Sequence, residues 1–203
     1  MATKITRESW EEFLNPEALR GKLISASLYL AAFEMLKTSI VDHLRDFYTF
    51  YFDDAGGHPD PKYDQDVLKR NRSPVYASLS WLLERAAIGQ ADIDLFETLK
   101  DCRNRIAHGM AHVALPSGTF DHLTLFPDLV GLLRKIETWW IVNVEIPTNE
   151  ELDSVDIDED GIIPGPIMTV KMLLDIALGS ESEAVAYLKA FQDRQQGRVA
   201  SDR

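Results

Sequence analysis

Three side chains suited to handling a phosphodiester lie close together in residues 103–109, Arg-Asn-Arg-Ile-Ala-His-Gly. A guanidinium such as that of Arg103 binds a phosphate through parallel hydrogen bonds, and an imidazole such as that of His108 exchanges a proton near neutral pH. The amide of Asn104 both donates and accepts hydrogen bonds. The segment therefore indicates a site that holds an anionic ester and moves a proton on it.

Helical geometry decides how these side chains face one another. A helix turns by roughly 100° per residue, so Asn104 and His108 share one face, whereas Arg103 and His108 are roughly 140° apart. The long arginine side chain can swing toward the histidine, or a second protomer can complete the geometry. A purely structural interpretation stays open, in which His108 caps the helix before Gly109 and Arg103 pairs with a nearby acid.

Apolar residues at three- and four-residue steps predict the elements that carry this segment. Asn15 and Pro16 are typical of a helix start, and the apolar stripe that follows predicts a long helix reaching as far as Phe52. Further helices are expected over 74–88 and 93–108, from Pro127 to Trp140, over 170–178 and over 184–192, with a loop at 53–61 and a turn at 116–118.

Alternation with a period of two residues is confined to short runs near 141–146. The sequence therefore predicts an all-α fold. We expect a four- or five-helix bundle over residues 1–146, followed by an acidic linker and a C-terminal helical extension over 147–203 that packs on the same unit.

Composition limits the partners of the chain. A formal net charge of −12 over 203 residues and a pI near 4.8 argue against a broad basic surface, although not against a small basic pocket. The single cysteine, Cys102, excludes an internal disulfide framework and suits a reducing compartment. Residues 1–10 lack the apolar core of a secretory signal, and no apolar run approaches the roughly 20 residues that span a bilayer. We expect a cytoplasmic protein without a membrane anchor.

The pattern Arg-Asn-x-x-x-His resembles that of the HEPN superfamily (higher eukaryotes and prokaryotes nucleotide-binding). Arg103, Asn104 and His108 carry the resemblance, late in a helix of a small all-α domain that opens with a long amphipathic helix. In the family pattern, four to six residues separate an arginine from a histidine, and the first of them is polar. In this chain four residues lie between Arg103 and His108. The resemblance covers about residues 15–146.

The resemblance implies a metal-independent endoribonuclease, commonly a toxin or effector of phage-defence, toxin–antitoxin or CRISPR systems. Such a protein acts as a homodimer on RNA, needs no cofactor, and has an antitoxin or sensor as a further partner. His108 would be the general base or acid, Arg103 would bind the scissile phosphate, and Asn104 would orient the site. Other HEPN domains are catalytically silent modules that bind nucleotides or partners, and this alternative stays open. A subgroup silenced by AMP transfer has a tyrosine two residues after the histidine, where this chain has Met110.

Three more side chains are candidates around the motif. Lys100 and Arg105 are either additional phosphate contacts or ordinary solvated charges. Glu34 is an acid within the apolar run Ala-Ala-Phe-Glu-Met-Leu. It is expected either to reach Arg103 and fix its rotamer or to be a surface glutamate of the first long helix.

A metal site is not expected. The acidic stretch that begins at Asp156 matches the first half of an EF-hand loop, but Ile167 stands where the bidentate glutamate belongs. Pro164 and Pro166 are expected to delay the helix that would follow. We interpret the stretch as a solvated acidic turn, with a contact to a basic partner as an alternative. The remaining histidines show no metal-ligand spacing: His43, His58, His112 and His122.

Overall fold

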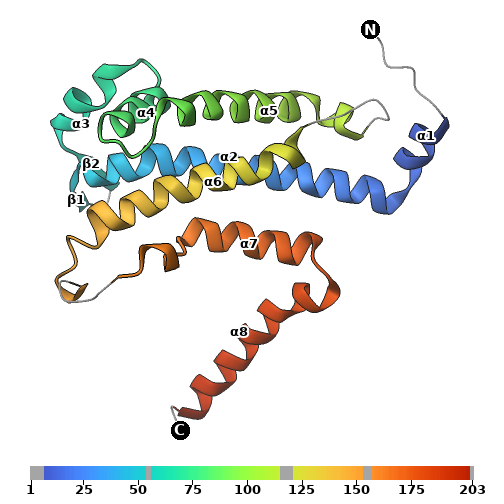
Figure 1. Cartoon of the computed structure of the whole chain (residues 1–203). Coiled ribbons are helices and arrows are strands. Elements are labelled where there is room, and N and C mark those ends of the chain that lie inside the picture. The colour runs from blue at the N-terminus through green and yellow to red at the C-terminus, as the bar shows by residue number, and fades with distance from the viewer. Residues whose placement is uncertain (1–6, 54–55, 115–120, 153–156, 202–203) are drawn as a thin grey trace.

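The computed structural model describes residues 7–53, 56–114, 121–152 and 157–201, and its fold is all-α apart from one small hairpin (Figure 1). The predicted fold class is therefore confirmed. The helices and strands are α1 (Arg7–Leu14), α2 (Pro16–Phe47), β1 (Thr49–Asp53), β2 (Gly56–Pro59), α3 (Pro61–Asp66), α4 (Pro74–Glu84), α5 (Gln90–Ala114), α6 (His122–Trp140), α7 (Gly165–Leu178) and α8 (Glu181–Ser201). Short 3-10 turns occupy 68–70, 150–152 and 159–161.

Helix α2 is the central element, and α4, α5, α6 and α7 all pack against it. Its start follows the predicted cap: the Asn15 side chain accepts hydrogen bonds from the backbone N–H groups of Glu17 and Ala18, at 3.0 and 3.3 Å. Pro16 occupies the first helical position, where its missing N–H costs nothing. A wide apolar stripe is buried along the helix, so burial against four neighbours holds it in place.

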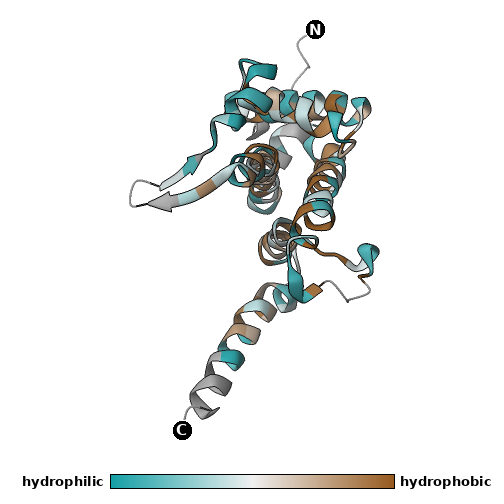
Figure 2. Cartoon of the chain, turned by 90° about the vertical axis from the view of Figure 1, so that its left-hand side faces the viewer, coloured by the Kyte–Doolittle hydropathy of each residue, from teal (hydrophilic) through white to brown (hydrophobic). Residues whose placement is uncertain are grey.

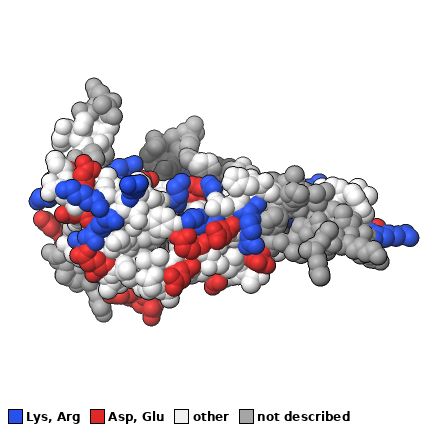
Figure 3. All heavy atoms as spheres, turned by 90° about the horizontal axis from the view of Figure 1, so that it is seen from above, with Lys and Arg blue, Asp and Glu red and all other residues white. Residues whose placement is uncertain are grey.

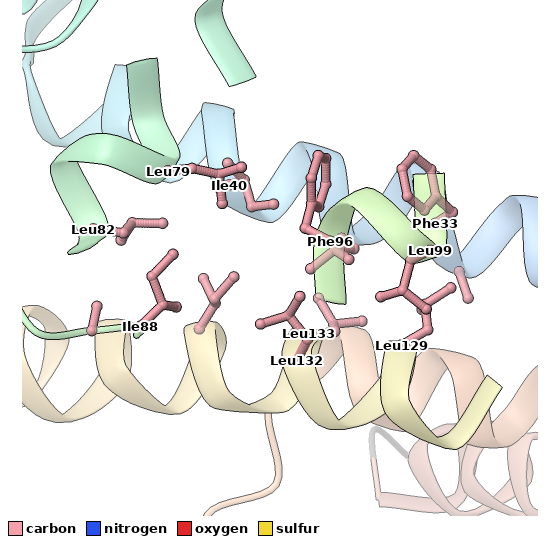
Figure 4. Packing of buried hydrophobic residues seen from close by; sticks show 14 of the residues in the cluster. Phe33, Ile40, Leu79, Leu82, Ile88, Phe96, Leu99, Leu129, Leu132 and Leu133 are labelled. Atoms are coloured by element: carbon pink, nitrogen blue, oxygen red, sulfur yellow. The ribbon is translucent and has the colours of Figure 1, made fainter. Parts of the chain in front are cut away.

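The hydrophobic core lies where α2, α4, α5 and α6 meet. Figure 4 shows Phe33 and Phe96 side by side, and their rings are stacked with centroids 5.6 Å apart. Leu99 and Leu133 are fully buried beside them. Because Leu99 belongs to the same helix as Arg103, burial of this stripe fixes which way the motif faces.

The aromatic run after α2 forms a hairpin, which corrects the expected helix end at Phe52. Helix α2 ends at Phe47, β1 occupies residues expected to be helical, and β2, inside the stretch expected to be a loop, pairs antiparallel with β1. Aromatic and β-branched residues favour strands, and Gly56 adopts φ +116°, which few other residues tolerate. Phe50 is exposed, so it does not belong to the core; Figure 2 shows the hairpin projecting from the bundle.

Several further helix boundaries differ from the prediction: α4 ends at Glu84 and not at 88, α7 begins at Gly165 and not at 170, and α8 spans Glu181–Ser201 and not 184–192. The helix expected to stop at Gly109 does break there (φ −119°, ψ 24°), and a second helical segment of α5 continues from this kink to Ala114. Helix α6 begins at His122, five residues before the expected start at Pro127. The extra turn buries His122 against Ser25 at 3.0 Å, and a proline near a helix start removes only one hydrogen bond. The alternating run 141–145 is a π-helical turn that extends α6.

The C-terminal segment begins with a helix that packs on the bundle. Helix α7 lies against α2 and α6, whereas α8 packs against α7 and projects away (Figure 1). We expected no stretch long and apolar enough to span a bilayer. By length and composition alone, two helical stretches do meet that criterion. They are α2, whose apolar window is 44% buried, and 159–178, whose window is 11% buried.

Candidate functional site

Arg103 is held in place by side chains from two helices. Its Nη2 donates to Glu34 Oε1 of α2 at 2.6 Å, and its Nη1 donates to Asn104 Oδ1 at 3.2 Å. The expectation that Glu34 reaches Arg103 is confirmed. Each of these two nitrogens keeps a second N–H, so the guanidinium is oriented yet still able to bind an anion.

Glu34 bridges two cations with its two carboxylate oxygens. Lys37 Nζ donates to Oε2 at 3.0 Å while Arg103 holds Oε1. Burial raises the pKa of Glu34, but the hydrogen bonds from Lys37 and Arg103 outweigh that effect and lower it below the usual value. The carboxylate therefore stays ionised near neutral pH and keeps Arg103 in one orientation.

A pocket of about 280 Å³ opens beside this cluster. Among its lining residues are Lys37, Lys100, Arg103 and Asn104, with Tyr76 as an aromatic wall. With the carboxylate of Glu34 counted against these three cations, the pocket keeps an excess of positive charge and an amide, which suit a phosphate with an attached sugar. The predicted contact residue Lys100 thus lies next to Arg103.

Lys100 is tied to neighbours on two sides of the pocket. Its Nζ donates to Glu97 at 2.8 Å and also to the Tyr76 hydroxyl, and it lies 4.9 Å from the centre of the Tyr76 ring. The hydrogen bonds to Glu97 and Tyr76 raise the pKa of Lys100. The ammonium group is therefore fully charged at neutral pH and stands at a fixed place in the pocket.

His108 lies outside this pocket. It is exposed on α5 one residue before the kink at Gly109, and it does not line the pocket of Arg103. Within the described part of the chain, it has no hydrogen-bond or ion-pair partner. In the single chain His108 therefore stands apart from the Arg103 pocket, and the imidazole is open to an incoming group.

Arg105 is separate from the phosphate-sized pocket. It is exposed, and its only ion pair among the described residues is a long one with Asp121, at 3.9 Å. It lines a different hollow together with Asn104 and Asp101. Arg105 therefore fits an outer contact to a polyanion better than a contact to the reacting phosphate.

The acidic stretch expected to be a turn is only partly described, because Asp156, like the turn at 116–118, lies outside the described residues. Asp158 accepts a hydrogen bond from the backbone of Asp160 at 3.2 Å and caps a 3-10 turn. Helix α7 starts directly at Gly165, so the expected delay is wrong: Pro164 and Pro166 occupy positions at a helix start that tolerate proline. Among the described residues, no three His, Cys, Asp or Glu side chains are placed to share a metal ion.

Sequence reasoning missed a half-buried ion pair between α2 and α6. His43 Nε2 lies 3.0 Å from Glu137 Oε1, and the imidazole stacks on Trp140 with centroids 5.4 Å apart. Glu137 is only 5% exposed. The signal was present, since Glu137 falls four residues after Leu133 and three before Trp140, on the apolar face of its helix.

The His43–Glu137 pair makes stability depend on pH. Burial lowers the pKa of His43, but Glu137 outweighs burial and raises it; burial raises the pKa of Glu137, but His43 and the nearby Ser39 hydroxyl lower it. The pair therefore stabilises the fold fully between the ordinary values of 4.5 and 6.5. This stabilisation is lost as pH rises through the raised pKa of His43 or falls through the lowered pKa of Glu137.

We expect His43→Gln to reduce the free energy of unfolding more at about pH 5.5 than at about pH 8.5, because only the protonated imidazole attracts the carboxylate. Urea unfolding of the wild type and the variant at both pH values measures the difference. An equal loss at both values would show that the pair acts as a neutral hydrogen bond.

Comparisons of the chain with protein-family models, with curated proteins and with solved structures found no match. The resemblance to HEPN domains consequently rests on Arg103, Asn104 and His108 and on the helices around them.

Proposed function

We propose that this protein is a HEPN-type, metal-independent endoribonuclease. The observation that carries the proposal is the Arg103 guanidinium, held by Glu34 and Asn104 at the edge of a pocket that also contains Lys100. An oriented guanidinium stabilises the negative charge that builds on a phosphate during cleavage. The exposed His108 on the same helix supplies the group that moves protons.

The chemistry needs few parts because RNA carries its own nucleophile. The imidazole of His108 removes the proton of a ribose 2′-OH, and the 2′-oxygen attacks the adjacent phosphorus. Arg103 neutralises the phosphorane while the bond to the 5′-oxygen breaks. A second imidazole protonates that oxygen, which leaves a 2′,3′-cyclic phosphate and a 5′-hydroxyl. In a homodimer the partner's His108 is the second imidazole.

The acidic net charge is compatible with this role because RNA needs a local, not a global, excess of cations. Figure 3 shows basic and acidic side chains mixed over the visible face, without a continuous basic surface. Lys37, Lys100 and Arg103 gather around one pocket. We infer a short RNA footprint with few phosphate contacts, which suits a nuclease that acts at a defined position.

Two observations favour a second candidate function, a catalytically silent HEPN-like module that binds a nucleotide or a partner protein. The net charge of −12 disfavours a nucleic-acid enzyme, and Glu34 already occupies part of the Arg103 guanidinium. A silent module binds a nucleotide in the pocket beside Arg103 without cleaving RNA.

Incubation of the purified protein with total RNA and with tRNA in EDTA separates the two candidates. A ribonuclease produces discrete fragments that accumulate with time. A silent module leaves the RNA intact while a nucleotide still raises the melting temperature of the protein. The role of the protein as a toxin or effector is tested by inducing it in cells and following growth, with the Arg103→Ala variant as the control.

Glu34→Gln tests the positioning of Arg103. We expect kcat to fall about tenfold with little change in KM, since a looser guanidinium costs stabilisation in the transition state more than binding of the ground state. The fold should survive, because ion pairs this exposed contribute roughly 0–1 kcal/mol to stability. Glu84→Gln is the matched control: Glu84 also pairs with an arginine, Arg70, but at the C-terminal end of α4 and outside the Arg103 pocket. Equal kcat in both variants would remove Glu34 from the site.

The proposed homodimer brings the two copies of His108 together at a two-fold axis. We expect light scattering to give twice the chain mass of 23.0 kDa at micromolar concentration. His108→Cys should then form an intermolecular disulfide under mild oxidation, which requires Cα atoms within about 7 Å. The native Cys102 is buried and does not interfere. Asp128→Cys, at an exposed position of α6, is the control that should stay unlinked, and a monomer would contradict the arrangement.

A further inference from the structure

A second cavity shares Glu34 with the Arg103 pocket but is otherwise lined by different residues. It measures about 760 Å³ and is bounded by α2, by Glu137 of α6 and by the start of α7. Its length follows α2, because Glu34, Thr38, Asp42 and Asp46 line it at successive four-residue steps. Twelve residues of helix span roughly 18 Å, so the cavity is an elongated groove.

Hydrogen-bond acceptors dominate the polar part of this groove. The carboxylates of Asp42, Asp46 and Glu137 line it, and only His43 and Arg45 among the lining residues carry basic groups. Oε1 of Glu137 pairs with His43, and the nearby Ser39 hydroxyl also interacts with this carboxylate, whose remaining lone pairs can accept from a further donor. A ligand that satisfies these groups must bring N–H donors and positive charge.

The buried Ser39 hydroxyl at the floor of the groove adds a hydrogen-bond acceptor next to the acids. Ser39 is 4% exposed and lines the groove, yet its Oγ makes no hydrogen bond of regular geometry with any described residue. It lies close enough to Glu137 to help lower the pKa of that carboxyl. A buried hydroxyl without a regular partner costs free energy that a bound donor can recover.

The walls of the groove add hydrocarbon surface to these acceptors. Ala31, Met35 and Pro166 line it, and all three contribute mainly methyl, methylene or ring carbons. A compact inorganic cation gains nothing from such walls. A chain of methylene groups that carries ammonium groups at intervals contacts both the apolar walls and the spaced carboxylates.

We propose that the groove between α2, α6 and α7 binds a linear aliphatic polyamine. Ammonium groups of the ligand pair with Asp42, Asp46 and Glu137, and one of them donates to the Ser39 hydroxyl. This site does not depend on the proposed ribonuclease activity.

Arg45 is the internal competitor of such a ligand. Its guanidinium lies 3.1 Å from Asp42 and 3.7 Å from Asp46, but its side chain is 51% exposed. Exposed ion pairs of this kind are weak, so a polyamine can displace the arginine into solvent. Removal of Arg45 should therefore strengthen binding.

Calorimetric titration with spermidine at about 0.15 M NaCl, where distant surface charges are screened, tests the site. We expect the double variant Asp42→Asn/Asp46→Asn to bind about tenfold more weakly than the wild type, Ser39→Ala about fivefold more weakly, and Arg45→Ala about threefold more tightly. Circular dichroism checks that each variant is folded.

The matched control is Asp64→Asn/Asp128→Asn, which removes the same charge from exposed positions on α3 and α6. It should bind spermidine as the wild type does. Equal weakening in both double variants would mean that the polycation is attracted to the acidic chain as a whole, and that result, like the absence of binding to the wild type, would overturn the proposal.

Discussion

Replacement of His108 by alanine should abolish RNA cleavage and leave the fold intact. General acid–base catalysis by a positioned side chain contributes roughly a hundredfold to ten-thousandfold to a rate. In the proposed dimer the substitution removes both imidazoles, so we expect the loss to reach the upper end of that range. His108 is exposed, so its loss should not unfold α5.

Gel assays of cleavage rate and circular dichroism of the same samples measure the two effects separately. His58→Ala makes the same chemical change in the hairpin, away from α5, and should retain full activity. Arg103→Ala should be as inactive as His108→Ala, whereas Arg105→Ala should retain most activity because Arg105 lies outside the Arg103 pocket. Cleavage at the wild-type rate by His108→Ala would refute the mechanism.

Much of the fold could be predicted because its signals are local. The Asn15 cap, the proline after it and the apolar stripe of α2 act over a few residues, and the structure confirms them. The end of α2 could not be predicted in the same way. Residues 49–53 leave the helix because they pair with β2, and a pairing between strands is not visible in the periodicity of either strand alone.

The start of α6 is a second boundary that local sequence signals could not predict. A proline at 127 indicated a helix start, yet the helix begins a turn earlier because His122 is buried against Ser25 from α2. Long-range contacts of this kind override a local preference worth about one hydrogen bond. Such contacts form only when the helices pack together, so the sequence of one helix does not reveal them.

The candidate site was predictable in its residue types and only partly in its geometry. An acid set in an apolar run made Glu34 a candidate partner of Arg103 beside the alternative of a surface glutamate, and the structure selects the first of these. The pocket walls could not be predicted, because Lys37 and Tyr76 come from two other helices whose packing on α5 places them there. The His43–Glu137 pair was missed because its two partners are 94 residues apart.

RNA with a single 2′-deoxyribose at the scissile position should resist cleavage completely. The proposed reaction uses the 2′-hydroxyl as the nucleophile, and deoxyribose has no group in its place. No rearrangement of Arg103 or His108 restores the missing oxygen, so the expected effect is larger than that of any substitution in the protein. The deoxy substrate should still bind and should inhibit cleavage of normal RNA, because the phosphate contacts are unchanged.

The cleavage products identify the nucleophile directly. Attack by the 2′-oxygen leaves a 2′,3′-cyclic phosphate, which mass spectrometry distinguishes from a linear phosphate by the mass of one water. The resemblance to HEPN domains implies that the reaction proceeds in EDTA, since an imidazole instead of a metal ion activates the nucleophile. DNA of the same sequence cut at an equal rate, or a reaction stopped by EDTA, would instead require an activated water molecule. The roles assigned to His108 and to the 2′-hydroxyl would then be wrong, while binding of the phosphate by Arg103 could still hold.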